Sequence, residues 1–452
     1  MTQTGRSTFR FRYVLLGVIT VCYTIQYMNR VTTNVLMPFI SKDIGMTAAQ
    51  IGLGGALMLL FYGPSQLLTG WMCDKIGSRK MLIFSIIAWS TLTAWLSEAK
   101  TVTEWYGRMA LFGALVGTEF VPSARLIVRW FPAKTRARAQ SVLSWAWIVT
   151  PAWAPLVSTA LYQSANDSWR TVLVILAILG VVPLLLIVLT VHDRPEKCRF
   201  ASKEEVLEAY EDELNKTLMT EDDIRGGNIH SIEAKAKSGN ISLREIISTK
   251  GFISLCFIYI AAQLAFWGVL SWSAQYMAQV HKFKVMEMGV WASVYFVGGA
   301  CGSFVSGWVS DKLLGGRRKP MLILCFACMI PFILVLASIQ KGVSPYFLLL
   351  TLTGAGFFSN MVWGPALTLP AEMYSVEVYG KAIGFVNCMA YMLAAASPYF
   401  MGLLIRTDPI TKLVDYSWAW IWVACTAVIG VVASSLLTEK RAFAPETGRS
   451  RP

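Results

Sequence analysis

The chain alternates between long apolar runs and short polar junctions. Twelve of the runs have about the 20 residues that an α-helix needs to cross the hydrocarbon core of a bilayer. They lie at roughly 13–38, 49–72, 81–97, 105–130, 138–163, 169–191, 252–279, 287–310, 319–340, 345–371, 380–405 and 416–437. Because a lone strand cannot satisfy its backbone hydrogen bonds in lipid, each run predicts a helix. The pattern therefore predicts an all-α integral membrane protein with twelve transmembrane helices.

A long polar segment at 192–251 divides these helices into two groups of six. Within it, Ser202 and Glu205 have the spacing of a capping box, which predicts a short amphipathic helix over 203–216. The predicted domains are an N-terminal six-helix half at 1–191, a cytoplasmic linker at 192–251, a C-terminal six-helix half at 252–437 and a cytoplasmic tail at 438–452. We interpret the linker as solvated, with a regulatory or partner-binding role as the alternative.

Charge is scarce and unevenly placed along the chain. The sequence is 55% hydrophobic and 15% charged, whereas soluble domains are about 25% charged. The net charge of +13 would fit nucleic-acid binding, but about 29 of the 40 Lys and Arg fall on one predicted side of the membrane. This bias predicts cytoplasmic N- and C-termini, a place in the inner or plasma membrane, and no nucleic-acid partner. The first run lacks a small-residue cleavage site, so we expect a first transmembrane helix rather than a removed signal.

The same charged turn occurs twice between apolar runs. "GWMCDKIGSRK" spans 70–80, and "GWVSDKLLGGRRK" spans 307–319 at the equivalent place in the second group of helices. Each turn combines a Gly that lets helices approach with an Asp that can cap a helix or pair with an Arg. We predict a conformational latch made of Gly70, Asp74, Lys75, Arg79, Asp311, Lys312 and Arg317, with a basic topology anchor as the alternative. Two similar halves with a site between them are typical of secondary transporters.

Further motifs follow in order along the chain. "FYGPSQLLTGWMCDKIG" places Tyr62, Gln66, Gly70 and Asp74 in a Tyr-x3-Gln-x3-Gly-x3-Asp pattern, "RWFPAKTRARA" follows, and "SWSAQYM" comes in the seventh run. In these motifs the chain resembles the major facilitator superfamily and, within it, the anion:cation symporter family of organic-anion transporters. The resemblance covers nearly the whole chain. It implies the major facilitator fold, two pseudo-symmetric six-helix halves and transport by alternating access.

Arg30 is the first candidate for the substrate site. It lies in the first run, on one polar helix face with Gln26, Tyr27 and Asn34. An Arg at a helix centre costs roughly 2.5–3.5 kcal/mol in lipid, so it must face a partner or a wet cavity. A planar guanidinium suits bidentate binding of a carboxylate, and the resemblance implies that an Arg here contacts the substrate anion. A structural ion pair between helices is the alternative.

Arg108 and Glu119 share a face of the predicted helix at 105–130, about 16 Å apart. Glu119 is an acid well inside an apolar run, where a carboxyl group readily accepts a proton. We predict that Glu119 couples transport to a proton, the alternatives being a permanent partner of an Arg such as Arg30 or a helix-end position. Two departures from the resembled family, Asn29 in place of Asp and Leu115 in place of Glu, leave proton coupling, sodium coupling and no coupling open.

The predicted substrate-binding residues are charged, polar or aromatic and are spread over several helices. They are Tyr27, Arg30, Tyr62, Gln66, Arg108, Gln263, Trp267, Asn360, Trp363 and Asn387. Packing between helices is the alternative for those of the second half. Tyr391 shares a helix face with Asn387, and Arg125 is expected to snorkel or to contact the latch.

We expect a monomeric transporter that takes up a small organic anion with a proton and uses no cofactor or metal. The sequence has no metal-ligand cluster, phosphate loop or nucleophile–base pair, which disfavours an enzyme, and its Cys-x-x-Cys at 325–328 lies in an apolar run. By resemblance, a sugar acid such as an aldonate, uronate or aldarate is the first expectation and an aromatic carboxylate the second. An efflux antiporter would show a Gly-rich fifth helix, where this chain has "SWAWIVTPAWAPLVS". A transporter-like sensor would need a partner surface, which only the linker could supply.

Overall fold

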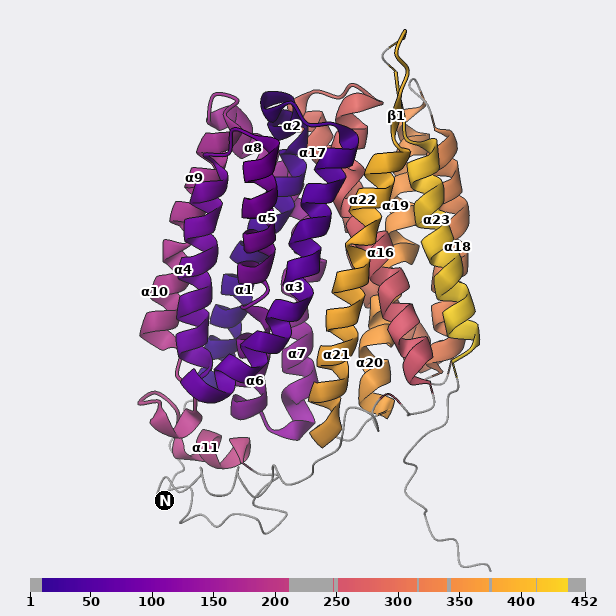
Figure 1. Cartoon of the computed structure of the whole chain (residues 1–452). Coiled ribbons are helices and arrows are strands. Elements are labelled where there is room, and N and C mark those ends of the chain that lie inside the picture. The colour runs from indigo at the N-terminus through magenta and orange to yellow at the C-terminus, as the bar shows by residue number, and fades with distance from the viewer. Residues whose placement is uncertain are drawn as a thin grey trace, which may run out of the picture.

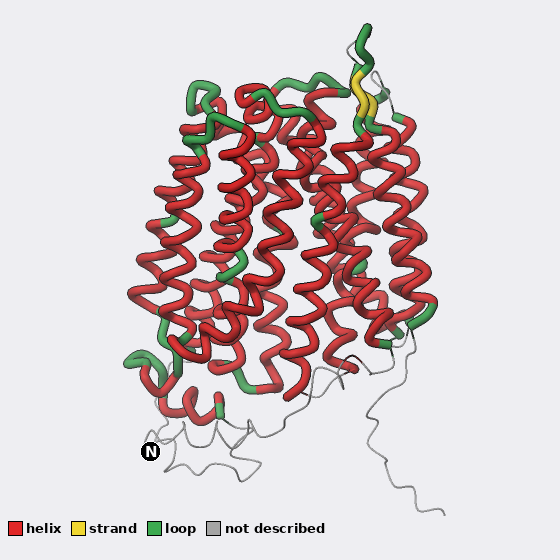
Figure 2. Tube along the Cα trace, in the orientation of Figure 1, coloured by secondary structure: helices red, strands yellow, loops and turns green. Residues whose placement is uncertain are grey.

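The computed structural model describes residues 10–210, 247, 251–314, 317–339, 343–373, 376–411 and 413–437. Figures 1 and 2 show a bundle of helices that run roughly parallel, with one short β hairpin at the end of the bundle opposite to helix α11 (Lys203–Ala209). The hairpin strands β1 (Arg406–Thr407) and β2 (Val414–Asp415) are antiparallel, with Arg406 opposite Asp415.

The helices form two groups in chain order, which we call the first half and the second half. The first half contains α1 (Phe11–Val35), α2 (Met37–Ile44), α3 (Ala48–Ile76), α4 (Ser78–Leu96), α5 (Val102–Val116), α6 (Phe120–Trp130), α7 (Ala133–Ile148), α8 (Thr150–Ser164), α9 (Trp169–Leu179) and α10 (Val181–Thr190). The second half contains α16 (Phe252–Gln279), α17 (Val285–Trp308), the π-helical turn η2 (Val309–Leu313), α18 (Arg318–Ser338), α19 (Pro345–Met361), α20 (Trp363–Met373), α21 (Val376–Ala394), α22 (Ala396–Leu404) and α23 (Ser417–Ser435). Between them lie the 3-10 turn η1 (Pro195–Lys197) and α11 (Lys203–Ala209).

Ten helical segments of the described residues are long and apolar enough to cross a membrane. They coincide with ten of the twelve predicted runs. The other two predicted runs, 81–97 and 138–163, are also helical, as α4 and as α7 with α8, but they are less apolar because they carry more polar residues. The prediction of an all-α membrane protein is thus confirmed, while the exact domain boundaries drawn from the sequence stay a prediction.

Proline explains why several predicted helices are interrupted. Each interruption is followed within three residues by a proline, which lacks the N–H that would continue the helix. These prolines are Pro38 after α1, Pro122 after α5, Pro151 after α7, Pro183 after α9, Pro365 after α19 and Pro398 after α21. The fourth and fifth predicted helices are interrupted in the first half, and so are their counterparts in the second half, the tenth and eleventh. The first and sixth predicted helices are interrupted too, but their counterparts α16 and α23 are continuous. The two halves therefore share the breaks of their fourth and fifth helices.

Close helix contacts repeat between the halves as well. A side chain on Gly113 of α5 would collide with the backbone carbonyl of Met58 on α3, and one on Gly356 of α19 would collide with that of Tyr295 on α17. Met58 and Tyr295 are separated by the same interval as the two charged turns. Small residues at such crossings let two backbones approach closely in a membrane. The repeat that the turns indicated therefore extends to the packing of the helices.

The two halves meet through several pairs of helices. α3 packs against α21 and α22, and α8 packs against α17. A side chain at Gly52 or Gly63 of α3 would collide with the backbone carbonyls of Pro398 and Cys388 respectively, so small residues are needed for this approach. α1 and α16 also touch across the centre of the bundle. Residues on α1, α3, α16 and α21 can therefore meet between the halves.

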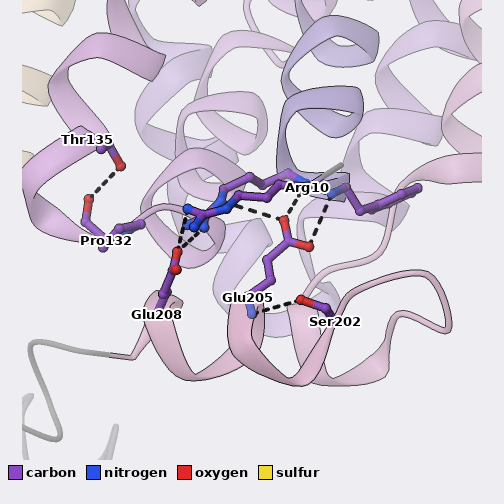
Figure 3. Close-up of polar contacts among 8 residues, drawn as sticks. Arg10, Pro132, Thr135, Ser202, Glu205 and Glu208 are labelled. Carbon is purple, nitrogen blue, oxygen red and sulfur yellow. Dashed lines mark hydrogen bonds and ion pairs between the residues drawn. The ribbon is translucent and has the colours of Figure 1, made fainter. Parts of the chain in front are cut away.

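The linker helix α11 docks on the start of α1, as Figure 3 shows. Glu205 accepts hydrogen bonds from the backbone N–H groups of Phe11 at 3.1 Å and Arg12 at 2.6 Å, so it caps the first turn of α1. Glu208 forms ion pairs with Arg10, at 2.8 Å, and with Arg12. Ser202 caps α11 itself through the Glu205 N–H at 3.1 Å, as the capping-box spacing predicted. The helix is seven residues long, and the rest of the predicted range, 211–216, lies outside the described residues.

We expect Glu205→Ala to destabilise the folded protein by about 1–3 kcal/mol, because two buried backbone N–H donors lose their acceptor and the buried Arg12 guanidinium loses an ion-pair partner. Thermal unfolding of the purified protein in detergent would measure the loss. Lys203→Gln, on the exposed side of the same helix, is the matched control and should leave the melting temperature unchanged. Equal melting temperatures for Glu205→Ala and the control would contradict a capping role for Glu205.

Candidate functional site

Arg30 lies five residues before the end of α1 and is fully buried, at 0% exposure. None of its three guanidinium nitrogens has a hydrogen-bond partner among the described residues, and no described carboxylate forms an ion pair with it. Removing a guanidinium from water without such partners is costly, and buried charges are normally paired. The positive charge of Arg30 is therefore not neutralised by a described carboxylate, which leaves the guanidinium available to an anionic ligand.

Three aromatic rings enclose the Arg30 guanidinium. Its central carbon lies 4.9 Å from the ring centroid of Tyr27, 4.3 Å from that of Tyr62 and 4.6 Å from that of Trp267. These distances are typical of cation–π contacts, which offset part of the cost of burying the charge. Tyr27 and Tyr62 come from α1 and α3 of the first half, whereas Trp267 comes from α16 of the second half. The predicted residue Arg30 thus lies at the contact between the halves.

Tyr391 of α21 completes this enclosure. Its ring lies 4.4 Å from that of Tyr62 and 6.4 Å from that of Trp267, centroid to centroid, and Gln263 lies beside it. The Tyr62 hydroxyl and the Trp267 indole N–H are buried without a hydrogen-bond partner among the described residues. We call Arg30, Tyr27, Tyr62, Trp267 and Tyr391 the Arg30 cluster. The cluster contains one cation, four aromatic rings and polar groups free to bind a ligand.

The other predicted residues of the second half lie in different surroundings. Asn360 packs on Gly299 of α17, which is a contact between helices, and it donates to the Gly356 carbonyl of its own helix α19 at 3.4 Å. Trp363 follows the break at Val362, so it lies on a different helical segment from Asn360. Its ring lies 5.2 Å from that of Trp147 on α7, so Trp363 also bridges the halves. Gln66 is buried on α3 and Asn387 is half-buried on α21.

Glu119 lies in the break between α5 and α6 and is fully buried. One carboxylate oxygen accepts a hydrogen bond from the Trp89 indole N–H at 2.9 Å, and the other has no partner among the described residues. The alternative in which Glu119 permanently pairs with Arg30 is wrong, because Arg30 makes no such contact. The predicted helix at 105–130 is interrupted at 117–119, so Arg108 and Glu119 lie on different helical segments, although both contact α4, through Trp95 and Trp89 respectively.

Arg108 lies apart from the Arg30 cluster. Its guanidinium donates to the Trp95 carbonyl at 2.5 Å and to Glu104 at 3.2 Å. With Glu98, Lys100 and Arg170 it lines an open cavity of about 530 Å³ at one end of the first half. At the same end, the Arg170 guanidinium hydrogen-bonded to Asp43 lowers the pKa of that carboxyl below its usual range. A substrate-binding role for Arg108 stays a prediction, and any substrate that Arg108 contacts would lie outside the Arg30 cluster.

The first charged turn contacts α6. Arg125 donates to the Gly70 carbonyl at 2.9 Å and forms an ion pair with Asp74, so the expected contact of Arg125 with the latch is present. Both helices belong to the first half, so this contact holds α3 to α6. Lys75 lies 3.8 Å from the Trp71 ring, and Asp193 accepts from the backbone N–H of Arg79 at 2.8 Å. Asp74 therefore pairs with α6 and not with an Arg of its own turn.

The second charged turn is partly described. Lys312 lies 5.8 Å from the Trp308 ring, which repeats the Lys75–Trp71 contact. Arg317 is exposed, and Arg318 donates to the Ser310 hydroxyl at 2.7 Å. The side chain of Asp311 lies outside the described residues.

Asp74→Asn should slow uptake by about tenfold and leave substrate affinity unchanged, because it removes the ion pair that fixes α3 on α6 while the Arg30 cluster stays intact. Initial uptake rates and equilibrium binding would be measured on the same preparation. Asp43→Asn removes the ion pair with Arg170 in the first half and is the matched control. An unchanged uptake rate in Asp74→Asn would argue against a conformational role for the turn.

No group of three or more His, Cys, Asp or Glu among the described residues could hold a metal ion. The cysteines of the described part are unpaired, and Cys325 is buried in α18, where it packs as expected. The arrangement at Arg30 is suited to holding an anion between two groups of helices.

Comparisons with known proteins identify the family of the chain. The family model of the Major Facilitator Superfamily matches residues 19–313 and 255–452. The probable sulfoacetate transporter SauU of Cupriavidus necator is 23% identical over 89% of this chain and 89% of its own. The probable galactarate/D-glucarate transporter GarP of Escherichia coli is 22% identical over 93% of both chains. The membrane sensor protein UhpC of Salmonella typhimurium is 25% identical over 94% of this chain and 90% of its own.

Solved structures show the same fold. The D-xylose–proton symporter superposes with a TM-score of 0.72 at 16% identity, covering 97% of this chain and 99% of the other. At this identity the likeness concerns the fold alone.

Proposed function

Because the chain belongs to the major facilitator superfamily, we propose that it carries a small organic anion across the membrane in symport with a proton. The chain is a multi-pass membrane protein of a transporter family and not an enzyme. The observation that carries the proposal is Arg30, which is buried between the halves without a counterion among the described residues. A carboxylate is the ligand that a guanidinium binds best, through two parallel hydrogen bonds.

Sugar acids are the first substrate class that we propose. Relatives named as transporters of galactarate and D-glucarate, or of sulfoacetate, support an acidic cargo. The Tyr62 hydroxyl and the Trp267 indole N–H would bind sugar hydroxyls, and aromatic rings commonly stack on sugars. An aromatic carboxylate is the second candidate, favoured by the four rings of the Arg30 cluster.

Glu119 is the residue that we propose to carry the proton. It is a buried carboxyl group in the first half with one oxygen unpaired among the described residues, and a neutral acid is the cheaper form at such a place. It lies in a helix break, a feature that transporters of this architecture use near their ion and substrate sites. Glu119 and Arg30 do not touch, so coupling would act through the movement of α5 and α6 relative to α1.

Rocking of the two halves would expose Arg30 alternately to each side of the membrane. The contacts that must part are those between Arg30 and Trp267 and between Tyr62 and Tyr391, since each joins the halves. We propose that both termini lie in the cytoplasm, as the distribution of Lys and Arg indicates. The domain boundaries at 191, 251 and 437 belong to this same proposal.

A sensor is the rival function, because one relative is named a membrane sensor protein. A sensor would bind the anion at the same cluster without moving it across the membrane. The α11 helix, which joins the linker to α1, would then report the state of α1 to a partner. Binding and transport assays on one preparation separate the two functions.

Uptake of labelled organic acids into proteoliposomes, with and without an imposed pH gradient, tests the proposal. The panel contains sugar acids and aromatic acids. We expect one acid or a related group to accumulate only when the gradient is imposed. Accumulation that ignores the gradient would refute proton coupling but retain transport, and binding without uptake would favour the sensor.

A further inference from the structure

We infer that the Arg30 cluster takes organic acids that carry a single negative charge and discriminates against those that carry two. This rests on the proposed function, because it names the charge class of the anion that the site would bind. The argument uses the number of uncompensated charges buried in the bundle and the chemistry of the groups around Arg30.

Arg30 is the one unpaired member of the buried arginines in the described part of the chain. Four described arginines are buried, and three of them have a carboxylate partner. Arg12 pairs with Glu205 and Glu208, Arg108 with Glu104, and Arg194 with Glu196. The buried described residues include no lysine. One positive charge is therefore available to a ligand inside the bundle.

The residues around Arg30 are neutral. Tyr27, Tyr62 and Trp267 surround the guanidinium, Tyr391 packs on Tyr62, and Gln263 lies beside Tyr391. A carboxylate on Arg30 makes the buried site neutral. A second carboxylate on the same ligand would enter surroundings without a second cation among the described residues, and an unpaired buried charge is strongly disfavoured.

The far end of the ligand would also meet neutral groups. Trp267 packs on Phe266, whose ring lies 6.4 Å from Trp147, and Trp147 in turn lies 5.2 Å from Trp363. The indole N–H groups of Trp267 and Trp363 have no acceptor among the described residues. Such a surface suits hydroxyl groups or a ring, which can accept from the indoles and stack on them.

This inference separates the chain from three of the substrates named for its relatives. Galactarate and glucarate carry a carboxylate at each end, and sulfoacetate carries a sulfonate and a carboxylate. All three are therefore dianions near neutral pH, where ordinary carboxyl groups of pKa about 4 are ionised. An aldonate has the same hydroxylated carbon chain with one carboxylate. The difference between the two classes is a single charge, which makes them a matched pair.

Equilibrium binding to the purified full-length protein at a pH near 7.5 tests the inference. The ligand pairs are gluconate with glucarate, which share six carbons, and benzoate with terephthalate, which share the ring. In each pair that binds, we expect the Kd of the dianion to be at least about tenfold higher than the Kd of the monoanion. Gln263→Lys, which adds a cation beside Tyr391, should reduce this ratio, and Gln263→Met is its neutral control.

The possible outcomes separate the inference from the proposed function. Equal or tighter binding of a dianion than of its monoanion would overturn the charge inference and leave anion binding intact. An unchanged ratio in a folded Gln263→Lys protein would also count against it. Failure of all four acids to bind would contradict the proposed organic-anion site, and the charge inference would fall with it.

Discussion

Arg30→Gln is expected to abolish uptake of the transported acid, with the initial rate falling at least about a hundredfold. Truncating one partner of a buried, hydrogen-bonded charge pair typically costs about 2–5 kcal/mol, and about 2.7 kcal/mol corresponds to a hundredfold. Gln keeps a polar side chain but loses the positive charge and the planar guanidinium that donates two hydrogen bonds to a carboxylate. The measurement is the initial uptake rate of labelled acid into proteoliposomes.

Two further variants make the Arg30 result specific. Arg30→Lys retains the charge but loses the planar fork, so it should recover part of the uptake and fall between wild type and Arg30→Gln. Arg170→Gln changes an arginine that pairs with Asp43 and lines the open cavity at one end of the first half. This variant should transport the acid at the wild-type rate. Wild-type uptake by a folded Arg30→Gln protein would remove Arg30 from the site.

Glu119→Gln is expected to eliminate accumulation driven by the pH gradient while exchange of substrate across the membrane survives. Glutamine has nearly the shape of a protonated glutamate and can still accept from the Trp89 indole, so packing at the helix break is preserved. Because glutamine cannot release or take up a proton, the pH gradient can no longer drive accumulation of the substrate. The measurement compares gradient-driven accumulation with exchange in the same proteoliposomes.

Glu98→Gln, an exposed acid of the first half, is the control for this experiment and should accumulate substrate like wild type. If Glu119→Gln still accumulates substrate under the gradient, Glu119 does not carry the proton. If both accumulation and exchange disappear in a folded variant, Glu119 is needed for the conformational cycle itself, and the coupling role is not supported.

The part of the site that the sequence could predict is the part with a strong local signal. An arginine inside an apolar run is costly, and its polar neighbours follow helical spacing, so the sequence alone places Arg30 and Tyr27 on one helix face. The resemblance to a known motif added Tyr62. Apolar runs and their polar junctions similarly predicted the helices, because a membrane imposes a length and a composition on each span.

The pairing of residues across the halves could not be predicted in this way. Trp267 was a candidate by its type and spacing, but its contact with Arg30 depends on how α16 crosses α1. Tyr391 shares the predicted helix face of Asn387, and it is the tyrosine that packs on Tyr62, while Asn387 stays half-buried on α21. Such contacts arise from the packing of separate helices, for which a single sequence carries no periodic signal.

The sequence analysis missed the helix breaks near Glu119 and Trp363. It treated Arg108 with Glu119, and Asn360 with Trp363, as residues of one continuous helix, although Pro122 and Pro365 follow the two breaks. Each of these prolines in the sequence indicated that the helix before it would be interrupted. The pairing of Asp74 with Arg125 was open from the sequence, because an exposed aspartate in a basic turn has several arginines within reach.

The central claim is that Arg30 binds the negative charge of the substrate between the two halves. Calorimetric titration of purified wild-type and Arg30→Gln protein, with the acid that gives the highest uptake, tests it most directly. We predict saturable binding to wild type and no measurable binding to Arg30→Gln when both proteins unfold at similar temperatures. Binding of the acid to Arg30→Gln with an unchanged Kd would contradict the claim and place the anion elsewhere in the molecule.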